Sequence, residues 1–223
     1  WKEMQHLRKL GYEIEAQPHL GYSLTGIPDK LFADEISHGL GTKLIGKTIL
    51  SYESLDSTND TAIQLGKEGI KEGLCVFAEW QKKGKGRLGR RWASPKGKNL
   101  LFSLLLRPRL LPADIPKITL TAGVSVVKTL QILSGKAVGI KWPNDIVYEG
   151  RKLGGILTEM DAEADRVHFL VVGIGINVNA SPHELVPGAV SLKEITRTET
   201  SRIALAQEIL REFELDYERV KDG

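Results

Sequence analysis

The chain has 223 residues, of which 41% are hydrophobic and 26% are charged. This composition is typical of a soluble globular protein and excludes a disordered, collagen-like or coiled-coil chain. No apolar run approaches the roughly 20 residues that cross a bilayer, and the first residues lack the apolar core of a signal peptide. The single cysteine, Cys75, cannot form an internal disulfide. We therefore expect a cytoplasmic protein with no membrane partner.

Positive charge is concentrated in one short segment. The chain has 31 lysines and arginines against 28 acidic residues, a net charge of +3. Eight of those basic residues, and no acid, lie between Lys82 and Lys98. The remainder of the chain has 23 basic and 28 acidic residues, a net charge of −5. Such a distribution favours a local anionic ligand over a broad nucleic-acid interface.

The predicted elements alternate between helices and strands. Residues 1–10 read as a helix that stops at Gly11, and residues 12–16 and 22–24 as a hairpin around 17–21. A short helix at 28–38, a strand at 48–53 and a helix opened by the cap residue Ser57 follow. Further strands are expected at 74–80, 99–107, 138–142, 145–149, 152–160 and 167–179, and helices at 115–133 and about 203–220. This order predicts an α+β fold with a mixed, largely antiparallel sheet.

Two phosphate-binding motifs match in letters but not in context. Residues 41–48 (GTKLIGKT) fit the P-loop pattern, but a P-loop follows a strand and opens a helix, whereas here a β-rich segment follows. Residues 84–89 (GKGRLG) fit the dinucleotide fingerprint, but no helix continues from them. We reject both interpretations.

The glycine-rich basic loop and one later strand nevertheless predict a binding site. Alternating glycines let the backbone approach a ligand closely, and the arginines among them can grip a phosphate or carboxylate with two parallel bonds. In residues 173–179 (GIGINVN), strand alternation places the isoleucines and valine on one face and the glycines and asparagines on the other. Glycine inside a strand often marks close approach of a ligand.

Five ordered segments together resemble the biotin–protein ligases: residues 56–59 (DSTN), 81–92 (QKKGKGRLGRRW), 141–145 (KWPND), 152–156 (KLGGI) and 173–177 (GIGIN). The helix and hairpin at the start of the chain are similar to the wing of the bacterial ligases that also repress the biotin operon. The resemblance implies a winged-helix remnant at residues 1–26 and a catalytic domain at 27–223, related to class II synthetases, with helices on one face of its sheet. It also implies a chain truncated at both ends, without the small C-terminal β domain of the bacterial enzymes.

The resemblance implies a two-step, ATP-dependent reaction, in which biotin is activated as biotinyl-5′-AMP and then transferred to a lysine of a biotin carboxyl carrier protein. Arg87 and Lys152 would be the catalytic pair and would also contact biotin. The other biotin-binding positions are Ser57, Thr58, Asn59, Gln81, Lys85 and Gly86. The ATP- and adenylate-binding positions are Arg90, Trp92, Lys141, Asn144, Gly154, Gly155, Gly175 and Asn177. Mg²⁺ is expected with ATP, and no metal ligand is assigned, although Asp145 is a candidate.

Two departures and two alternatives accompany this interpretation. Lys85 stands where the family usually has arginine, and Lys83 replaces a small residue.

The first alternative is a lipoate–protein ligase-like enzyme of related fold, and the second is a non-enzymatic DNA-binding regulator. We expect no operator binding by this chain, because most of a DNA-binding domain is missing, and the resemblance is compatible with a homodimer.

Overall fold

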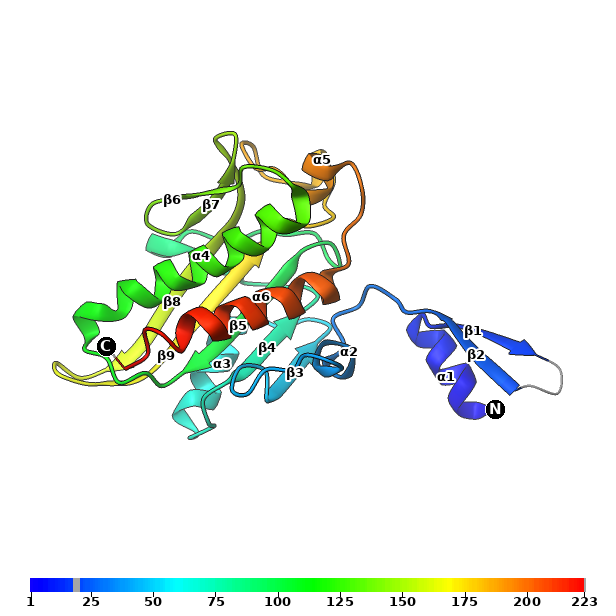
Figure 1. Cartoon of the computed structure of the whole chain (residues 1–223), viewed down its shortest axis with the longest axis horizontal. Coiled ribbons are helices and arrows are strands. Elements are labelled where there is room, and N and C mark those ends of the chain that lie inside the picture. Colours follow the sequence, from blue (N-terminus) through cyan, green and yellow to red (C-terminus); the bar gives the residue numbers. More distant parts are fainter. Residues whose placement is uncertain (18–20, 223) are drawn as a thin grey trace. The chain divides into compact units, whose positions relative to one another are not determined.

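A computed structural model describes residues 1–17 and 21–222 and divides the chain into two units, residues 1–30 and residues 31–223 (Figure 1). The first unit contains helix α1 (Lys2–Leu10) and the antiparallel strands β1 (Glu13–Gln17) and β2 (Gly21–Gly26). Gly11 ends α1 in a left-handed conformation with φ of 106°, which glycine adopts without steric cost. The helix and the two strands were predicted, whereas the centre of the predicted turn, residues 18–20, lies outside the described residues. The winged-helix interpretation stays a prediction.

The second unit is built on a seven-stranded sheet with the order β3-β4-β5-β9-β8-β7-β6. Its strands are β3 (Thr48–Tyr52), β4 (Leu74–Ala78), β5 (Leu100–Leu106), β6 (Gly139–Lys141), β7 (Asp145–Tyr148), β8 (Arg151–Ala162) and β9 (Val167–Ile176). Only the β3–β4 pair is parallel, and the other neighbours run antiparallel. The predicted mixed, largely antiparallel sheet is confirmed.

Helices cover both faces of this sheet, which corrects the expectation that they share one face. The long helices α4 (Ile115–Ser134) and α6 (Arg202–Tyr217) lie across one face and enclose the larger core (Figure 1). Helix α3 (Thr58–Lys67) packs on the opposite face, where Ala62 joins Leu105, Phe169 and Val171 in a second core. The reason is visible in β4 and β5, in which every residue is buried. Strands that are apolar on both sides require cover on both sides.

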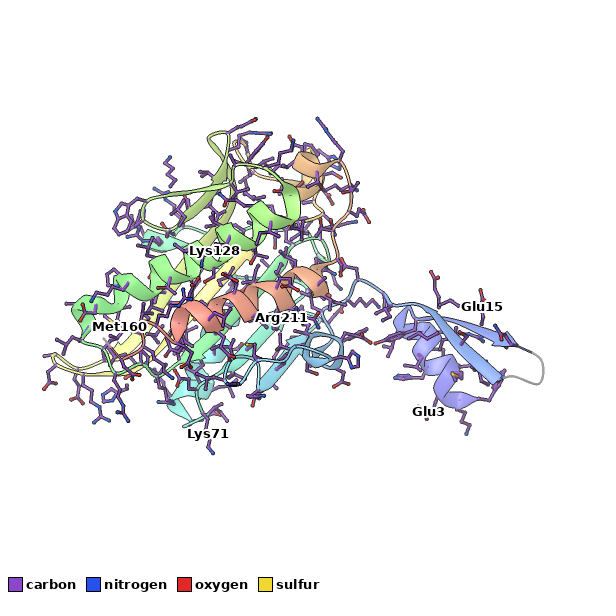
Figure 2. The ribbon with its side chains drawn as sticks, in the orientation of Figure 1. Glu3, Glu15, Lys71, Lys128, Met160 and Arg211 are labelled. Carbon is purple, nitrogen blue, oxygen red and sulfur yellow. The ribbon has the colours of Figure 1, made fainter. Side chains whose placement is uncertain are left out.

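The remaining elements are short: helices α2 (Ala33–Ser37) and α5 (Leu192–Thr196), and 3-10 turns at Arg87–Gly89, Pro112–Asp114 and Pro182–Glu184. Lys128 of α4, labelled in Figure 2, joins this helix to α6. Its Nζ lies 3.1 Å from Glu212 and 2.9 Å from Asp216. Within the part of the chain that the structure describes, no helix combines the length and the apolarity of a membrane span.

The P-loop-like segment binds a carboxylate of the protein itself. The backbone N–H groups of Lys43, Leu44 and Ile45 donate to the Glu214 side chain of α6 over 2.7, 2.7 and 2.8 Å. The next element is strand β3 and not a helix, so the rejection of the P-loop interpretation is confirmed. Partial burial of Glu214 opposes its ionisation, but the three N–H donors prevail and hold the pKa of this carboxyl below its ordinary value. The contact therefore depends on the charged form.

We predict that Glu214→Gln lowers the free energy of unfolding by about 1–2 kcal/mol at pH 7, since bonds to a charged acceptor are lost. Because the folded-state pKa lies below the unfolded value of about 4.3, this stabilisation is present above that pH and fades as pH falls through the folded-state pKa. Urea unfolding at pH 7 and at acid pH measures both effects. The control is Glu208→Gln on the same helix, an exposed partner of Arg211, which should change stability by less than about 0.5 kcal/mol. A pH-independent loss in Glu214→Gln would contradict the prediction.

Candidate functional site

A small pocket of about 50 Å³ lies on the face of the sheet that also carries α3. Its walls come from the start of α3, the basic loop, the β6–β7 turn and strands β8 and β9. Twelve of the sixteen predicted site residues line it: Ser57, Thr58, Asn59, Gln81, Lys85, Gly86, Arg87, Trp92, Asn144, Lys152, Gly155 and Gly175. The structure thus brings together segments that are distant in the sequence.

The start of α3 forms a buried polar wall of the pocket. Ser57 caps the helix as predicted, and its side chain accepts a bond from Asp60 N. Thr58 donates to Gln81 Oε1 from both its backbone N–H, over 2.7 Å, and its hydroxyl, over 3.1 Å. A helix N-terminus leaves backbone N–H groups without partners, and Gln81 satisfies one of them. These bonds fix the orientation of Thr58 and Gln81.

Asn59 is held on every side by the protein. Its Nδ2 donates to Glu159 Oε2 over 2.7 Å and to Leu157 O over 3.2 Å, while its Oδ1 lies 2.6 Å from the hydroxyl of Ser103. Only 4% of Asn59 is exposed. Because both ends of its amide are already bonded, Asn59 shapes the pocket wall rather than offering a free group to a ligand.

Strand alternation places Gly173 and Gly175 of β9 on the pocket face, as predicted, but protein side chains occupy the space beside them. Ile174 and Ile176 point into the larger core, whereas a Cβ at Gly173 would lie 2.2 Å from Asn59 Oδ1. A Cβ at Gly175 would lie 2.8 Å from the Trp92 ring. The space next to these glycines is therefore filled by protein side chains, and the Trp92 indole rests on the bare strand surface. Its Nε1 is buried and bonded to no group among the described residues.

Three cationic side chains line the pocket, Lys85 and Arg87 from the basic loop and Lys152 from β8. Lys152, at the start of β8, bonds Asp145 over 2.6 Å and lies 5.6 Å from the centre of the Trp92 ring. Arg87, in the basic loop, donates to Asn144 Oδ1 over 3.3 Å. Asn144 in turn donates to the carbonyl of Ile156 over 2.8 Å. A strand and a loop thus both bring positive charge to one small volume, an arrangement suited to an anionic ligand.

Four predicted residues lie outside this pocket. Arg90 lines a larger neighbouring cavity. Lys141 is exposed at the end of β6. Strand alternation places Gly154 on the face of β8 opposite to the pocket, where a Cβ would contact Ile146. The fourth is Asn177.

Asn177 is 4% exposed and takes part in a buried network. Its Oδ1 accepts from Asn99 Nδ2 over 3.0 Å, and its Nδ2 donates to Val190 O over 3.2 Å and to Lys152 O over 3.4 Å. The amide therefore holds the backbone of Lys152 in place. This differs from the predicted contact with a nucleotide base, for which these bonds would first have to break.

Sequence reasoning missed Ser103 and Glu159, which both orient Asn59. The sequence contains a signal for each of them. Ser103 is the only polar residue in the apolar strand β5, and Glu159 shares the pocket face of β8 with Gly155 and Leu157 by alternation. Neither signal says which partner the side chain meets.

The described residues contain no group of three or more His, Cys, Asp or Glu side chains able to hold a metal ion. Asp145, the candidate metal ligand, engages Lys152 instead. These donors do not fit a protein-built metal cage.

Comparisons with known proteins agree with these features. Residues 51–177 match the biotin/lipoate A/B protein ligase family. The chain is 42% identical to the bifunctional ligase/repressor BirA of Bacillus subtilis, over 97% of this chain and 68% of that protein. It is 36% identical to BirA of Escherichia coli, over 79% of this chain and 54% of that one.

Solved structures agree as well. The biotin protein ligase from Aquifex aeolicus in complex with biotin and ATP matches with a TM-score of 0.66 at 32% identity, covering 78% of this chain and 72% of that chain. The Leishmania major biotin protein ligase in complex with biotinyl-5-AMP matches with a TM-score of 0.63 at 26% identity, covering 79% of this chain and 82% of that chain.

We predict that Gly173→Ala destabilises the protein by about 1–3 kcal/mol, because the new methyl group would overlap Asn59 and disturb its bonds. The matched control is Gly139→Ala in strand β6, where a Cβ has no neighbour within 4 Å and the change should stay within about 0.5 kcal/mol. Urea unfolding of both variants measures the difference. Equal stability of the two would show that the close contact at Gly173 is relieved without cost.

Proposed function

Because the chain belongs to the biotin/lipoate A/B protein ligase family, we propose that it is a biotin–protein ligase. It activates biotin with ATP as biotinyl-5′-AMP and then transfers biotin to a lysine of a biotin carboxyl carrier protein. The observation that carries the proposal is the meeting of Arg87 and Lys152 in one pocket beside the polar groups of Thr58 and Gln81. A protein that uses ATP and keeps Cys75 as a free, buried thiol is suited to the reducing cytoplasm.

The first step joins two anions, the biotin carboxylate and the α-phosphate of ATP. A carboxylate oxygen attacks the α-phosphorus, the bond to pyrophosphate breaks, and a mixed anhydride forms. Positive charge must offset the repulsion of the reactants and the charge that develops on the phosphoryl oxygens. Arg87 and Lys152 supply that charge, and the bond between Lys152 and Asp145 holds the ammonium group ready in its position.

The second step moves the biotinyl group. The amine of the acceptor lysine attacks the carbonyl carbon of the anhydride, an amide forms, and AMP leaves as the amine loses a proton. The chain's main tasks are to align the reactants and to exclude water, which would otherwise hydrolyse the anhydride. The basic loop is suited to the second task, since Lys85, Gly86 and Arg87 line the pocket directly.

The polar wall is suited to the ureido ring of biotin, which presents two N–H donors and one carbonyl acceptor. Ser57, Thr58 and Gln81 offer hydroxyl and amide groups in fixed positions. A site that hydrogen-bonds its ligand rejects analogues that leave its buried polar groups unpaired. This reasoning favours biotin over lipoate, whose dithiolane ring has no N–H or carbonyl group.

The nucleotide is proposed to stack on Trp92, whose indole N–H is buried without a bond among the described residues. Asn144 lies beside it, and Arg90 in the neighbouring cavity can contact phosphate. Mg²⁺ would come with the phosphates of ATP, since such ions are held largely by substrate oxygens and water. Lys141, Gly154 and Asn177 lie outside the pocket, so we propose no ligand contact for them.

Transfer of radiolabelled biotin to a purified carboxyl carrier domain tests the function. We expect label on the carrier only in the presence of ATP, and none when labelled lipoate and its own carrier domain replace biotin and its carrier. ATP-dependent lipoyl transfer without biotinyl transfer would assign the chain to the other branch of the family.

We further predict that Lys152→Gln lowers the rate of biotin-dependent pyrophosphate release by about 100-fold or more. This is the usual effect of removing one hydrogen-bond donor that is positioned at the charge developing in the transition state. Lys136→Gln removes the same charge from an exposed position after α4 and should leave the rate unchanged. A Lys152→Gln enzyme within threefold of the wild-type rate would exclude a catalytic role for this lysine.

A further inference from the structure

A buried serine lies behind the polar wall of the pocket. Ser103 belongs to the apolar strand β5, and no part of it is exposed to solvent. Its hydroxyl oxygen lies 2.6 Å from Asn59 Oδ1 and 2.7 Å from Thr58 Oγ1. Thr58 and Asn59 line the pocket, and Ser103 lies one layer behind them. Ser103 can therefore act on a ligand only through these two neighbours.

The amide of Asn59 has one possible orientation. Its Nδ2 faces the Glu159 carboxylate over 2.7 Å and the Leu157 carbonyl over 3.2 Å. A carboxylate and a backbone carbonyl can only accept, so the two amide hydrogens must point at them. Asn59 Oδ1, which also can only accept, is therefore the atom that faces Ser103. The single hydroxyl hydrogen of Ser103 is thus committed to Asn59.

Two hydroxyl hydrogens serve three oxygen–oxygen contacts along this wall. From Asn59 through Ser103 and Thr58 to Gln81, these contacts measure 2.6, 2.7 and 3.1 Å. Because Ser103 donates to Asn59, its short contact with Thr58 requires the hydrogen of Thr58. That hydrogen is shared between Ser103 Oγ and Gln81 Oε1 in a three-centre bond, with the larger share in the shorter contact. Both partners are oxygens of the protein.

The Thr58 hydroxyl therefore faces the pocket as an acceptor. Its oxygen has two lone pairs, but its one hydrogen is held by the protein. Turning that hydrogen toward a ligand would leave the Thr58 and Ser103 oxygens 2.7 Å apart with no hydrogen between them. Leaving a buried polar group unpaired in this way shifts an equilibrium constant by about tenfold to 100-fold. The wall thus favours a ligand that donates to Thr58 over one that accepts from it.

We propose that Ser103 is a positioning residue that sets the specificity of the pocket. It holds the Thr58 hydroxyl as an acceptor, so the site selects a ring that presents an N–H group at this place. The ureido ring of biotin meets this requirement, because both of its nitrogens carry a hydrogen. The identity of that ring rests on the proposed function; the held hydroxyl does not.

Carbon NMR of the ligand-free full chain tests the held hydroxyl. In an equal mixture of H₂O and D₂O, a hydroxyl hydrogen that exchanges slowly gives two Cβ signals, one for the protonated and one for the deuterated form. We expect such a pair for Thr58 in the wild type and one averaged signal in Ser103→Ala. The matched control is Ser125→Ala, which removes an equally buried hydroxyl that bonds Asp216 and should leave the pair intact.

Binding of ring analogues tests the specificity. In two cyclic carbamates, one or the other ureido N–H of biotin is replaced by a ring oxygen. Since Thr58 can face only one of these positions, we expect the wild type to bind one carbamate about 100-fold or more weakly than biotin. In Ser103→Ala the freed Thr58 hydrogen can turn toward that oxygen, and this ratio of dissociation constants should fall about fivefold or more.

The ratio for the other carbamate should stay constant in Ser103→Ala, and both ratios should stay constant in Ser125→Ala. A serine that served only the fold would weaken biotin and both carbamates alike and leave every ratio unchanged. This comparison therefore distinguishes a role in specificity from a role in stability.

An averaged Thr58 signal in the wild type would overturn the proposal without any variant. A signal pair that persists in Ser103→Ala, or carbamate ratios that are equal in the wild type and Ser103→Ala, would also overturn it. A held Thr58 hydroxyl in a wild type that binds no biotin would instead refute the proposed function and retain Ser103 as the residue that fixes Thr58.

Discussion

The candidate site depends on a steric constraint: β8 and β9 must lack side chains at Gly155, Gly173 and Gly175. Gly173 admits Asn59 and Gly175 admits the Trp92 ring, each at a separation that a methyl group would violate, and a Cβ at Gly155 would lie 3.3 Å from the same ring. The sheet can then carry polar and aromatic groups from α3 and the basic loop directly on its backbone. Without these glycines, neither the polar wall nor the aromatic surface could approach the strands.

On this surface the two proposed catalytic cations are held in different ways. Lys152 lies on a strand whose backbone is bonded by Gly188, Val190 and the Asn177 side chain. Arg87 lies on the basic loop, and its side chain donates to Asn144. One proposed catalytic charge therefore comes from a strand and the other from a loop.

The buried network behind Lys152 extends across the sheet. Asn177 bonds Asn99, the backbone carbonyl of Asn99 accepts from Arg202 of α6, and Arg202 pairs with Glu79 over 2.7 Å with 1% of its side chain exposed. Glu79 also accepts the backbone N–H of Leu31. A buried ion pair contributes little net stability unless its remaining groups are bonded, and here they are. The network ties the end of β4 and the start of α6 to the strand that carries Lys152.

The sequence alone was sufficient for the mixed sheet, the helix capped by Ser57 and the segments that carry the site, because alternation, caps and glycine spacing are local properties. It also excluded the P-loop, since the element that follows residues 41–48 could be read from β-branched residues. Only the tertiary structure showed that a carboxylate from α6 occupies that loop, that α3 covers the second face, and that Asn177 faces its own backbone rather than the pocket. It alone revealed the pairing of Lys85 with Asp60 and Glu159. Each of these contacts joins residues far apart in the chain, and a residue's type records what it can bond but not which distant partner the packing brings within reach.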